Sequence, residues 1–258
     1  MRSTAVRRAA LAASTAAFAL LVTACGGGSG DDGKHEGGSS AAPEATPAAK
    51  ALTAAELEKA ALAQADVTSG KVTTKVPAGD PVAQDEVTTD DEACAPLAYA
   101  QAGTYAGTPA ATARRSWLGE PKKPAEGASA EESVLATLDI ESVALTLSSY
   151  EDGGAEKAMK DLGTAAEKCA GGFTYTADGS ETEVLSVVTT EAPKGGDEGL
   201  AVTMAIDVEG DKAPMKVVVV RKGATVAYFP AMNLASAASG KDFTFPAQVV
   251  EAQVAKLG

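Results

Sequence analysis

Residues 200–229, LAVTMAIDVEGDKAPMKVVVVRKGATVAYF, predict three antiparallel strands that follow one another along the chain. The first, 200–208, alternates between apolar and other residues, as a strand with one face in the core does. Its predicted core-facing side chains are Val202, Met204, Ile206 and Val208. The second, 215–221, contains the run Val217 to Val220, which indicates a central strand covered on both faces. Lys222-Gly223 predicts a tight hairpin into the third strand, 224–229.

Helices and further strands surround this stretch. Thr53 and Glu56 form a capping box, which predicts a helix over 54–65. Another helix is predicted over 155–168, because one apolar stripe is formed by Met159, Leu162, Ala166 and Cys169. The other predicted elements are helices at 91–102 and 246–257, strands at 71–76, 112–118, 134–150 and 183–190, and an exposed loop at 120–132. The predicted fold class is α+β, an antiparallel β-sheet flanked by helices in a single disulfide-stapled domain over 51–258.

The N-terminal segment has the pattern of a bacterial lipoprotein signal peptide. Arginines at positions 2, 7 and 8 precede an uncharged stretch, 9–24, that ends in Val22-Thr23-Ala24-Cys25. This stretch is shorter than the about 20 apolar residues that a permanent membrane span needs. We therefore expect a signal peptide at 1–24, acylation of Cys25 with palmitate-type chains, and a flexible linker over 25–50. The chain would then be anchored by lipid at the extracytoplasmic face of the cell membrane. An ordinary secretory signal with a chance cysteine is the alternative.

The composition argues against several classes of function. Lys and Arg number 22 against 35 Asp and Glu, a net charge of −13, whereas nucleic-acid binding needs clusters of basic residues. The single histidine, His35, lies in the linker, which excludes most zinc sites and His-based catalysis. We predict no catalytic, cofactor-binding or metal-binding residue. The remaining acid–base candidates are the pairs Asp139–Glu141 and Asp207–Glu209, of which the second is expected on the solvent side of its strand.

Two cysteines remain in the predicted domain once Cys25 is acylated. An even pair in an exported domain most often forms a disulfide, so we expect Cys94 and Cys169 to be joined. The alternative is a redox pair, which usually needs a close spacing such as Cys-x-x-Cys. A disulfide here would tie the start of the helix at 91–102 to the end of the helix at 155–168.

One polar and aromatic group is suited to contact a ligand: Arg114, Arg115 and Trp117. An arginine over an indole receives an anionic or sugar ligand. A buried tryptophan with arginines at the surface is the alternative interpretation of the same residues. A similar pair of alternatives, an apolar pocket or a filled core, applies to Tyr228, Phe229, Phe243 and Phe245.

Three runs carry a resemblance to a known family: LTAAELEKAALAQADV (52–67), ALTLSSYEDGGAEKAMKDLGTAAEKCAGGF (144–173) and FPAQVVEAQVAKL (245–257). They resemble a group of actinobacterial lipoproteins, which are in turn similar to the extracellular sensor domain of mycobacterial serine/threonine protein kinase H. The resemblance implies an antiparallel sheet flanked by helices, disulfide support and a ligand-binding cleft. Cys169 matches a family cysteine by position. This chain departs from the kinase domain in having one possible disulfide rather than two.

These observations lead to two hypotheses of function. The first is a non-enzymatic, membrane-anchored extracytoplasmic lipoprotein that binds an unknown small ligand or acts as a sensor-like domain. The second is an interaction module that scaffolds proteins of the cell envelope. A deep apolar cleft would favour the first and a flat face with an apolar patch the second. A hydrolase of envelope polymers would need two carboxylates facing each other in a cleft.

Overall fold

The computed structural model describes residues 49–74 and 82–257. The predicted signal peptide, Cys25, His35 and the predicted linker up to residue 48 lie outside the described residues. Within the described ranges, no helix is both long enough and apolar enough to cross a membrane.

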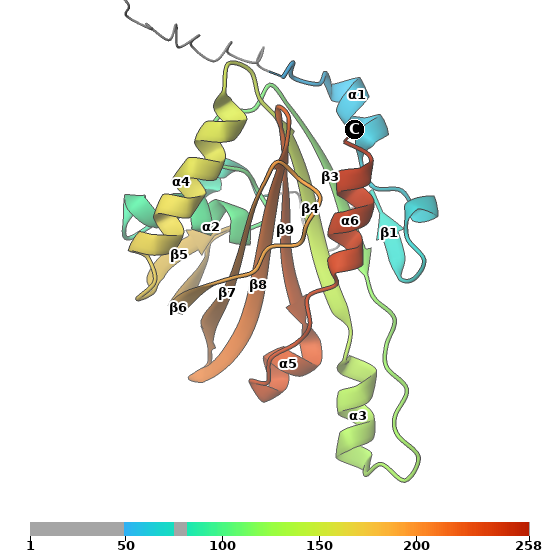
Figure 1. The fold of residues 1–258 in the computed structure, drawn as a ribbon. Coiled ribbons are helices and arrows are strands. Elements are labelled where there is room, and N and C mark those ends of the chain that lie inside the picture. The colour runs from blue at the N-terminus through green and yellow to red at the C-terminus, as the bar shows by residue number, and fades with distance from the viewer. Residues whose placement is uncertain (1–48, 75–81, 258) are drawn as a thin grey trace, which may run out of the picture. The chain divides into compact units, whose positions relative to one another are not determined.

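The domain is built on a sheet of nine strands, in which every neighbouring pair is antiparallel (Figure 1). The order across the sheet is β1-β3-β4-β9-β8-β7-β6-β5-β2. The strands are β1 (Lys71–Thr73), β2 (Val87–Thr89), β3 (Ala111–Leu118), β4 (Glu141–Ser149), β5 (Phe173–Ala177), β6 (Ser180–Thr190), β7 (Glu198–Val208), β8 (Asp211–Lys222) and β9 (Thr225–Asn233). The predicted α+β class with an antiparallel sheet is confirmed.

Helices cover both faces of this sheet. They are α1 (Ala54–Ala60), α2 (Ala95–Gln101), α3 (Ala130–Leu138), α4 (Gly154–Lys168), α5 (Leu234–Ser239) and α6 (Ala247–Ala255). Short 3-10 turns occupy Gln64–Asp66, Gln84–Glu86 and Glu92–Cys94. In Figure 1, α2 and α4 lie on one side of the domain, and α1 and α6 lie on the other.

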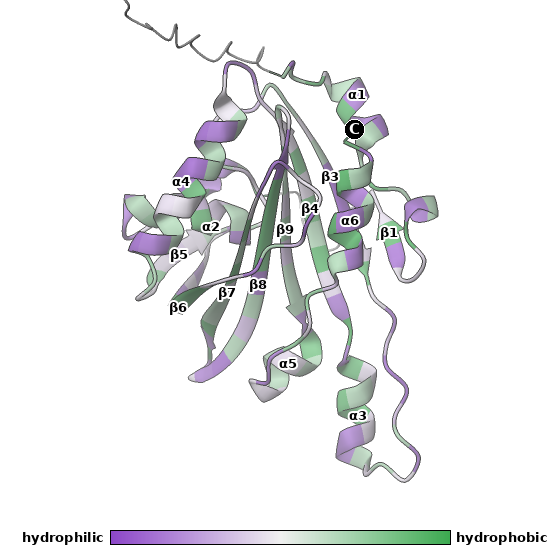
Figure 2. Ribbon diagram, viewed as in Figure 1, coloured by the Kyte–Doolittle hydropathy of each residue, from purple (hydrophilic) through white to green (hydrophobic). Residues whose placement is uncertain are grey.

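Two hydrophobic cores follow from this arrangement. The core that includes α2 and α4 contains Val217 and Val219, and we call it the α4-side core. The core that includes α1 and α6 contains Val218 and Val220, and we call it the α6-side core. All four valines are at most 3% exposed, so successive side chains of β8 point into opposite cores. The prediction that β8 is a central strand covered on both faces is confirmed. Figure 2 shows hydrophobic residues concentrated along β8 and its neighbours in the centre of the sheet.

The core-facing side of β7 is shorter than its alternation predicts. Val202 and Met204 are buried, but Ile206 is only half-buried and Val208 is 42% exposed. The end of the β7–β8 hairpin extends past α4, which packs on this side of the sheet (Figure 1). Its last residues therefore keep the alternating pattern without a layer to pack against.

Helix α1 begins where its capping box predicts but ends earlier than predicted. The amide of Glu56 donates to Thr53 Oγ1 at 3.3 Å, and the amide of Thr53 donates to Glu56 Oε2 at 2.9 Å. Beyond Ala60, the side chain of Gln253 accepts from the Leu62 amide at 2.7 Å and donates to the Ala60 carbonyl at 2.8 Å. These contacts satisfy the backbone where the helix stops and allow Leu62 to be buried in the α6-side core.

The prediction of a loop at 120–132 followed by a strand at 134–150 is wrong at the junction. Helix α3 occupies 130–138, and β4 begins only at Glu141. A second capping box explains the helix, because Ser129 Oγ accepts from the Glu132 amide at 3.2 Å and Glu132 Oε2 accepts from the Ser129 amide at 2.8 Å. Strands β2 and β5 and helix α5 were not predicted, and the remaining helices and strands lie within a few residues of their predicted bounds.

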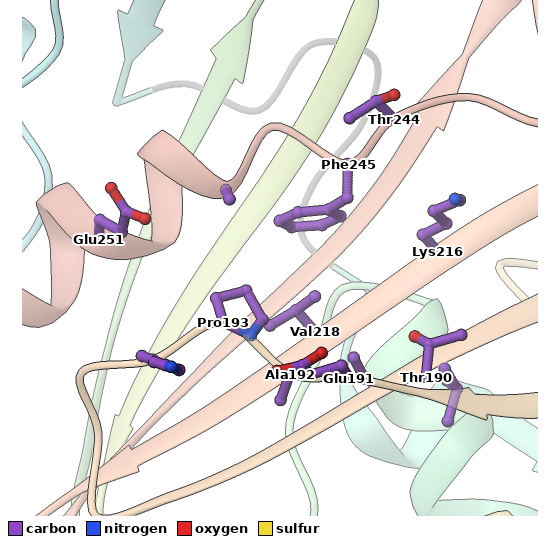
Figure 3. Close-up of a pocket in the computed structure, with 13 residues that line it drawn as sticks. Thr190, Glu191, Ala192, Pro193, Lys216, Val218, Thr244, Phe245 and Glu251 are labelled. Carbon is purple, nitrogen blue, oxygen red and sulfur yellow. The ribbon is translucent and has the colours of Figure 1, made fainter.

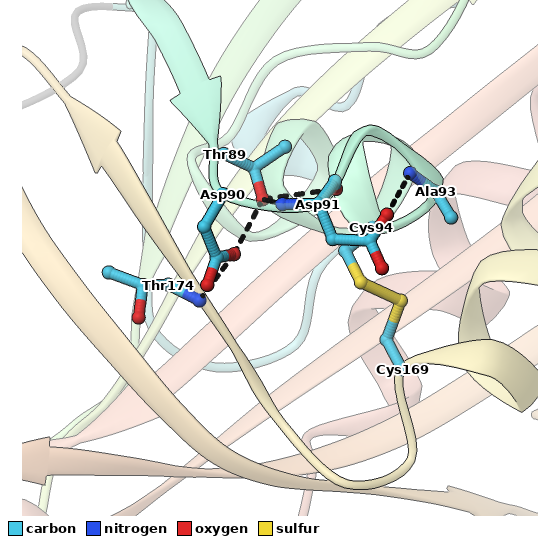
Figure 4. Close-up of a disulfide and its surroundings, with 7 residues drawn as sticks. All are labelled: Thr89, Asp90, Asp91, Ala93, Cys94, Cys169 and Thr174. Atoms are coloured by element: carbon cyan, nitrogen blue, oxygen red, sulfur yellow. Dashed lines mark hydrogen bonds between the residues drawn. A yellow bond between two sulfur atoms is a disulfide. The ribbon is translucent and has the colours of Figure 1, made fainter.

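Cys94 and Cys169 form the predicted disulfide, with their Cα atoms 5.9 Å apart (Figure 4). It joins the start of α2 to the end of α4 inside the α4-side core, where each cysteine is 2% exposed. Beside it, Asp91 accepts from the Ala93 amide at 2.9 Å, and Asp90 accepts from the Thr174 amide at 3.0 Å. Asp90 and Asp91 therefore hold the backbone around the disulfide.

Candidate functional site

The candidate site is a cavity of about 450 Å³ on the α6 side of the sheet (Figure 3). Strands β7 and β8 form its floor, and its walls come from the segment after β6 and from the segment that leads into α6. The lining residues are Thr190, Glu191, Ala192, Pro193, Lys194, Ala201, Val202, Lys216, Val218, Thr244, Phe245, Ala247 and Glu251. The cavity thus combines residues from parts of the chain that are distant in sequence.

A glycine pair brings the first wall close to the sheet. Gly195 has φ +121°, in the range that favours glycine. A Cβ on Gly196 would lie 2.2 Å from Val220 Cγ1, which no side chain tolerates. Asp197 holds the end of this segment, because its Oδ2 accepts from the Gly223 amide at 2.7 Å. The Gly195-Gly196 pair therefore allows residues 191–197 to fold over β8 and close one side of the cavity.

Lys216 is the ordered cation at one end of the cavity. Its Nζ lies 3.0 Å from Asp242 Oδ1 and 5.2 Å from the centroid of the Phe243 ring. Its side chain is 16% exposed, whereas that of Asp242 is 71% exposed. Its aliphatic part thus lies along the wall while the ammonium group stays at the rim.

Phe245 separates this cavity from a second one of similar size. The second cavity, also about 450 Å³, is bounded by Trp117, Gly119 and Pro246 among others. Three residues line both cavities: Thr244, Phe245 and Ala247. The two spaces therefore lie on either side of the segment that leads into α6.

The carboxylates of Asp139 and Glu141 both lie near Lys122, and Lys122 and Asp139 line a third cavity. Lys122 Nζ lies 2.7 Å from Asp139 Oδ2 and 4.0 Å from Glu141 Oε1. Burial alone would raise the pKa of Asp139, but hydrogen bonds from Lys122 and Asn233 outweigh it and lower that pKa. Asp139 is thereby held as an anion, the opposite of what a general acid in glycoside hydrolysis requires.

The other predicted acidic pair forms a turn. Asp207 Oδ1 accepts from the Gly210 amide at 3.1 Å, and Glu209 adopts φ +56° in the β7–β8 connection. Within residues 49–74 and 82–257, no group of three or more His, Cys, Asp or Glu side chains is placed to hold a metal ion.

The predicted ligand group of Arg114, Arg115 and Trp117 is divided by the pleat of β3. Arg115 is 8% exposed and donates to the carbonyls of Leu62, Arg114 and Glu58, and it pairs with Glu58 Oε2 at 2.8 Å. Trp117 is 3% exposed, with Nε1 donating to the Ser69 carbonyl at 3.0 Å. Arg114 points to the other face and reaches the Val82 carbonyl at 3.4 Å. The structure does not bring the three side chains into one site.

The aromatic candidates also fall into two sets. Tyr228 and Phe229 are fully buried in the two cores, whereas Phe243 and Phe245 line cavities. Sequence reasoning missed the wall at residues 190–194 and the role of Lys216. The signals for them were the Pro-Lys-Gly-Gly run at 193–196 and a lysine directly before the four valines of β8.

No protein-family model matches this chain, and no curated protein matches it. Among solved structures, it is similar to the extracellular domain of PknH from Mycobacterium tuberculosis, with 13% sequence identity and a TM-score of 0.42. The match covers 81% of this chain and 95% of that chain. The structural comparison thus finds the resemblance that the sequence runs predict. Neither a ligand nor an activity follows from it.

Proposed function

We propose that this chain is a lipid-anchored extracytoplasmic protein whose folded domain binds a small ligand as a non-enzymatic, sensor-like module. The sequence supports the location, because the first 25 residues carry the lipoprotein pattern that ends in Cys25. The disulfide between Cys94 and Cys169 supports it as well, because disulfides persist in oxidising compartments outside the cytoplasm.

The cavity in Figure 3 is the observation that carries ligand binding. Its volume of about 450 Å³ lies within the range of small-molecule sites. Seven of its 13 lining residues are apolar and six are polar or charged, so the pocket combines apolar walls with groups that can orient a ligand. Binding without catalysis agrees with Asp139 and Lys122 being paired with each other outside this cavity.

Comparing native and denatured masses of the full chain from its own host tests both parts of this proposal. Acyl chains on Cys25 are covalent, so they remain after denaturation, whereas a cavity ligand leaves. We expect a denatured mass above that of the processed polypeptide, and a native mass higher by one small molecule. A denatured mass without acyl groups would contradict the anchor, and equal native and denatured masses would contradict the ligand.

A matched pair of variants assigns the extra native mass to the cavity. Ala201 lines the cavity from β7, so Ala201→Phe places a ring inside it. Ala205 lies on the same face of β7, two pleats further along and outside the cavity lining, so Ala205→Phe is the control. The ligand mass should disappear in the first variant and persist in the second.

An envelope scaffold is the second candidate function, and α3 is the observation that favours it. This helix extends away from the sheet in Figure 1, and it contains no buried residue. Its Val134 is 58% exposed, which leaves an apolar side chain available to a partner. Site-specific photo-crosslinking from position 134 in cells should yield a discrete heterologous adduct if this candidate is right, and none if it is wrong.

A further inference from the structure

The middle of the cavity is largely apolar, and the exposed charged residues Glu191 and Lys194 also line it. The apolar lining consists of small and aliphatic side chains and one ring, among them Ala192, Pro193, Ala201, Val218 and Phe245. Figure 3 shows Lys216 and Thr244 toward one end and Glu251 toward the other. A ligand with an apolar chain and one polar head matches this division, because the chain leaves water while the head stays at an end.

Two lysines line the cavity, and Lys216 is better placed than Lys194 to select that head, because its side chain is largely buried against the wall whereas Lys194 is exposed. The ammonium group of Lys216 has three hydrogen-bond donors. Among the described residues, it forms an ion pair with Asp242. Asp242 is 71% exposed, so its carboxylate can turn into water at little cost, whereas the 16% exposed Lys216 side chain remains at the wall. An anion at this end of the cavity would then take the place of Asp242 at the ammonium group.

We infer that the cavity takes a single-chain aliphatic carboxylate, with its carboxylate at Lys216 and its chain along the apolar middle. This ligand class rests on the proposed function. At about 30 Å³ per group of water size, the 450 Å³ cavity holds roughly 15 such groups, close to the size of dodecanoate.

Phe245 sets the length of the chain that fits. Its side chain is part of the wall between the first cavity and the second, which has the same volume of about 450 Å³. Removing the ring joins the two spaces, so a longer chain gains additional apolar contacts. Each further buried methylene strengthens binding by about four-fold.

The head group is tested by titrating the full chain with dodecanoate and with 1-dodecanol, its uncharged counterpart. Lys216→Gln should weaken dodecanoate binding by roughly ten-fold or more, because a charge-assisted hydrogen bond is lost. It should change 1-dodecanol binding by less than about two-fold. Asp242→Asn should strengthen dodecanoate binding, because the competing carboxylate is gone. Lys212→Gln is the charge-matched control, since Lys212 lies on β8 outside the cavity lining and should leave both affinities unchanged.

The outcomes separate this inference from the proposed function. Equal losses for both probes in Lys216→Gln, or no loss for either, would overturn the carboxylate assignment. Absence of binding by either probe to the wild-type chain would overturn the ligand class. In each case, ligand binding by the cavity is judged independently by the native mass of the wild-type chain and of the variants Ala201→Phe and Ala205→Phe.

Chain length is tested with dodecanoate and hexadecanoate, each below its micelle concentration. The wild-type chain should bind the two with similar affinity, because its cavity is filled by the shorter one. Phe245→Ala should bind hexadecanoate at least about ten-fold more tightly than dodecanoate. Phe173→Ala removes a ring from the other core and should keep the wild-type ratio. An unchanged ratio in a folded Phe245→Ala chain would refute the assignment of Phe245.

Discussion

Reducing the disulfide should remove a large share of the domain's stability. Cys94 and Cys169 are separated by 75 positions, so the bond closes a loop of about 76 residues in the unfolded chain. In the chain-entropy model, a loop of this length stabilises the folded state by about 4.5 kcal/mol. For a domain of this size, each kcal/mol corresponds to about 2–4 °C, so the melting temperature should fall by roughly 9–18 °C.

Urea unfolding of three samples separates the contribution of the unfolded chain from that of the core. The samples are the oxidised chain, the reduced chain and the variant Cys94→Ala/Cys169→Ala. If the bond acts on the unfolded chain, its loss lets that chain expand, so the dependence of stability on urea should steepen. The double variant should be at least as unstable as the reduced chain, because it also leaves space in the core. Both cysteines are 2% exposed, so a mild reductant should act slowly under native conditions.

Two results would refute this reasoning. A loss below about 1 kcal/mol on reduction would show that the unfolded chain gains little freedom when the bond opens. A reduced chain with altered near-ultraviolet circular dichroism before any urea is added would show that the bond instead holds the native packing of α2 on α4. In that case, the contribution belongs to the folded state.

Three further predictions concern buried polar groups and one turn. Arg115→Met should destabilise the domain by about 2–4 kcal/mol in urea unfolding, because several carbonyls lose the donor that Arg115 provides. Glu58→Gln should lower the free energy of unfolding by less than about 1 kcal/mol, because Glu58 is largely exposed. Burial raises the pKa of Tyr228 to about 12 and also raises the pKa of Tyr150. The free energy of unfolding should therefore stay at its full value below about pH 10 and fall by about 1.4 kcal/mol per tyrosine and pH unit toward pH 12. Tyrosinate absorbance at 295 nm should appear together with unfolding. Gly70→Ala should lower the melting temperature, because φ of Gly70 is +75° and the new Cβ would lie 2.5 Å from the indole ring of Trp117. An unchanged melting curve would contradict this close approach.

The parts of the fold that the sequence predicts well are those governed by local periodicity. The stripe that begins at Met159 and the valines of β8 each reflect one element packing against a continuous layer. Where a distant side chain decides the outcome, local patterns are insufficient. Helix α1 ends early because Gln253, from the other end of the domain, bonds to the backbone at Ala60 and Leu62. No pattern within residues 54–65 contains that information.

Helix α3 illustrates a conflict between two local signals. Val134 and Leu135 favour a strand, whereas the Ser129–Glu132 capping box favours a helix. The helix forms because α3 contributes no buried residue, so no layer imposes an extended backbone on it. Weighing the capping box above the apolar residues would have corrected the prediction.

The cavity was hard to predict for a different reason, which lies in how the two faces of the sheet are covered. On the α4 side, α4 packs closely, the disulfide ties α2 to it, and Tyr150 bonds to Tyr228 at 2.8 Å. On the α6 side, short helices are joined by segments without regular structure, among them residues 240–246. Such segments do not present the continuous apolar stripe of a long helix to the sheet, and their backbone also needs hydrogen-bond partners. Space remains on this face between residues 190–194 and Phe245, and this uneven covering accounts for the position of the candidate site.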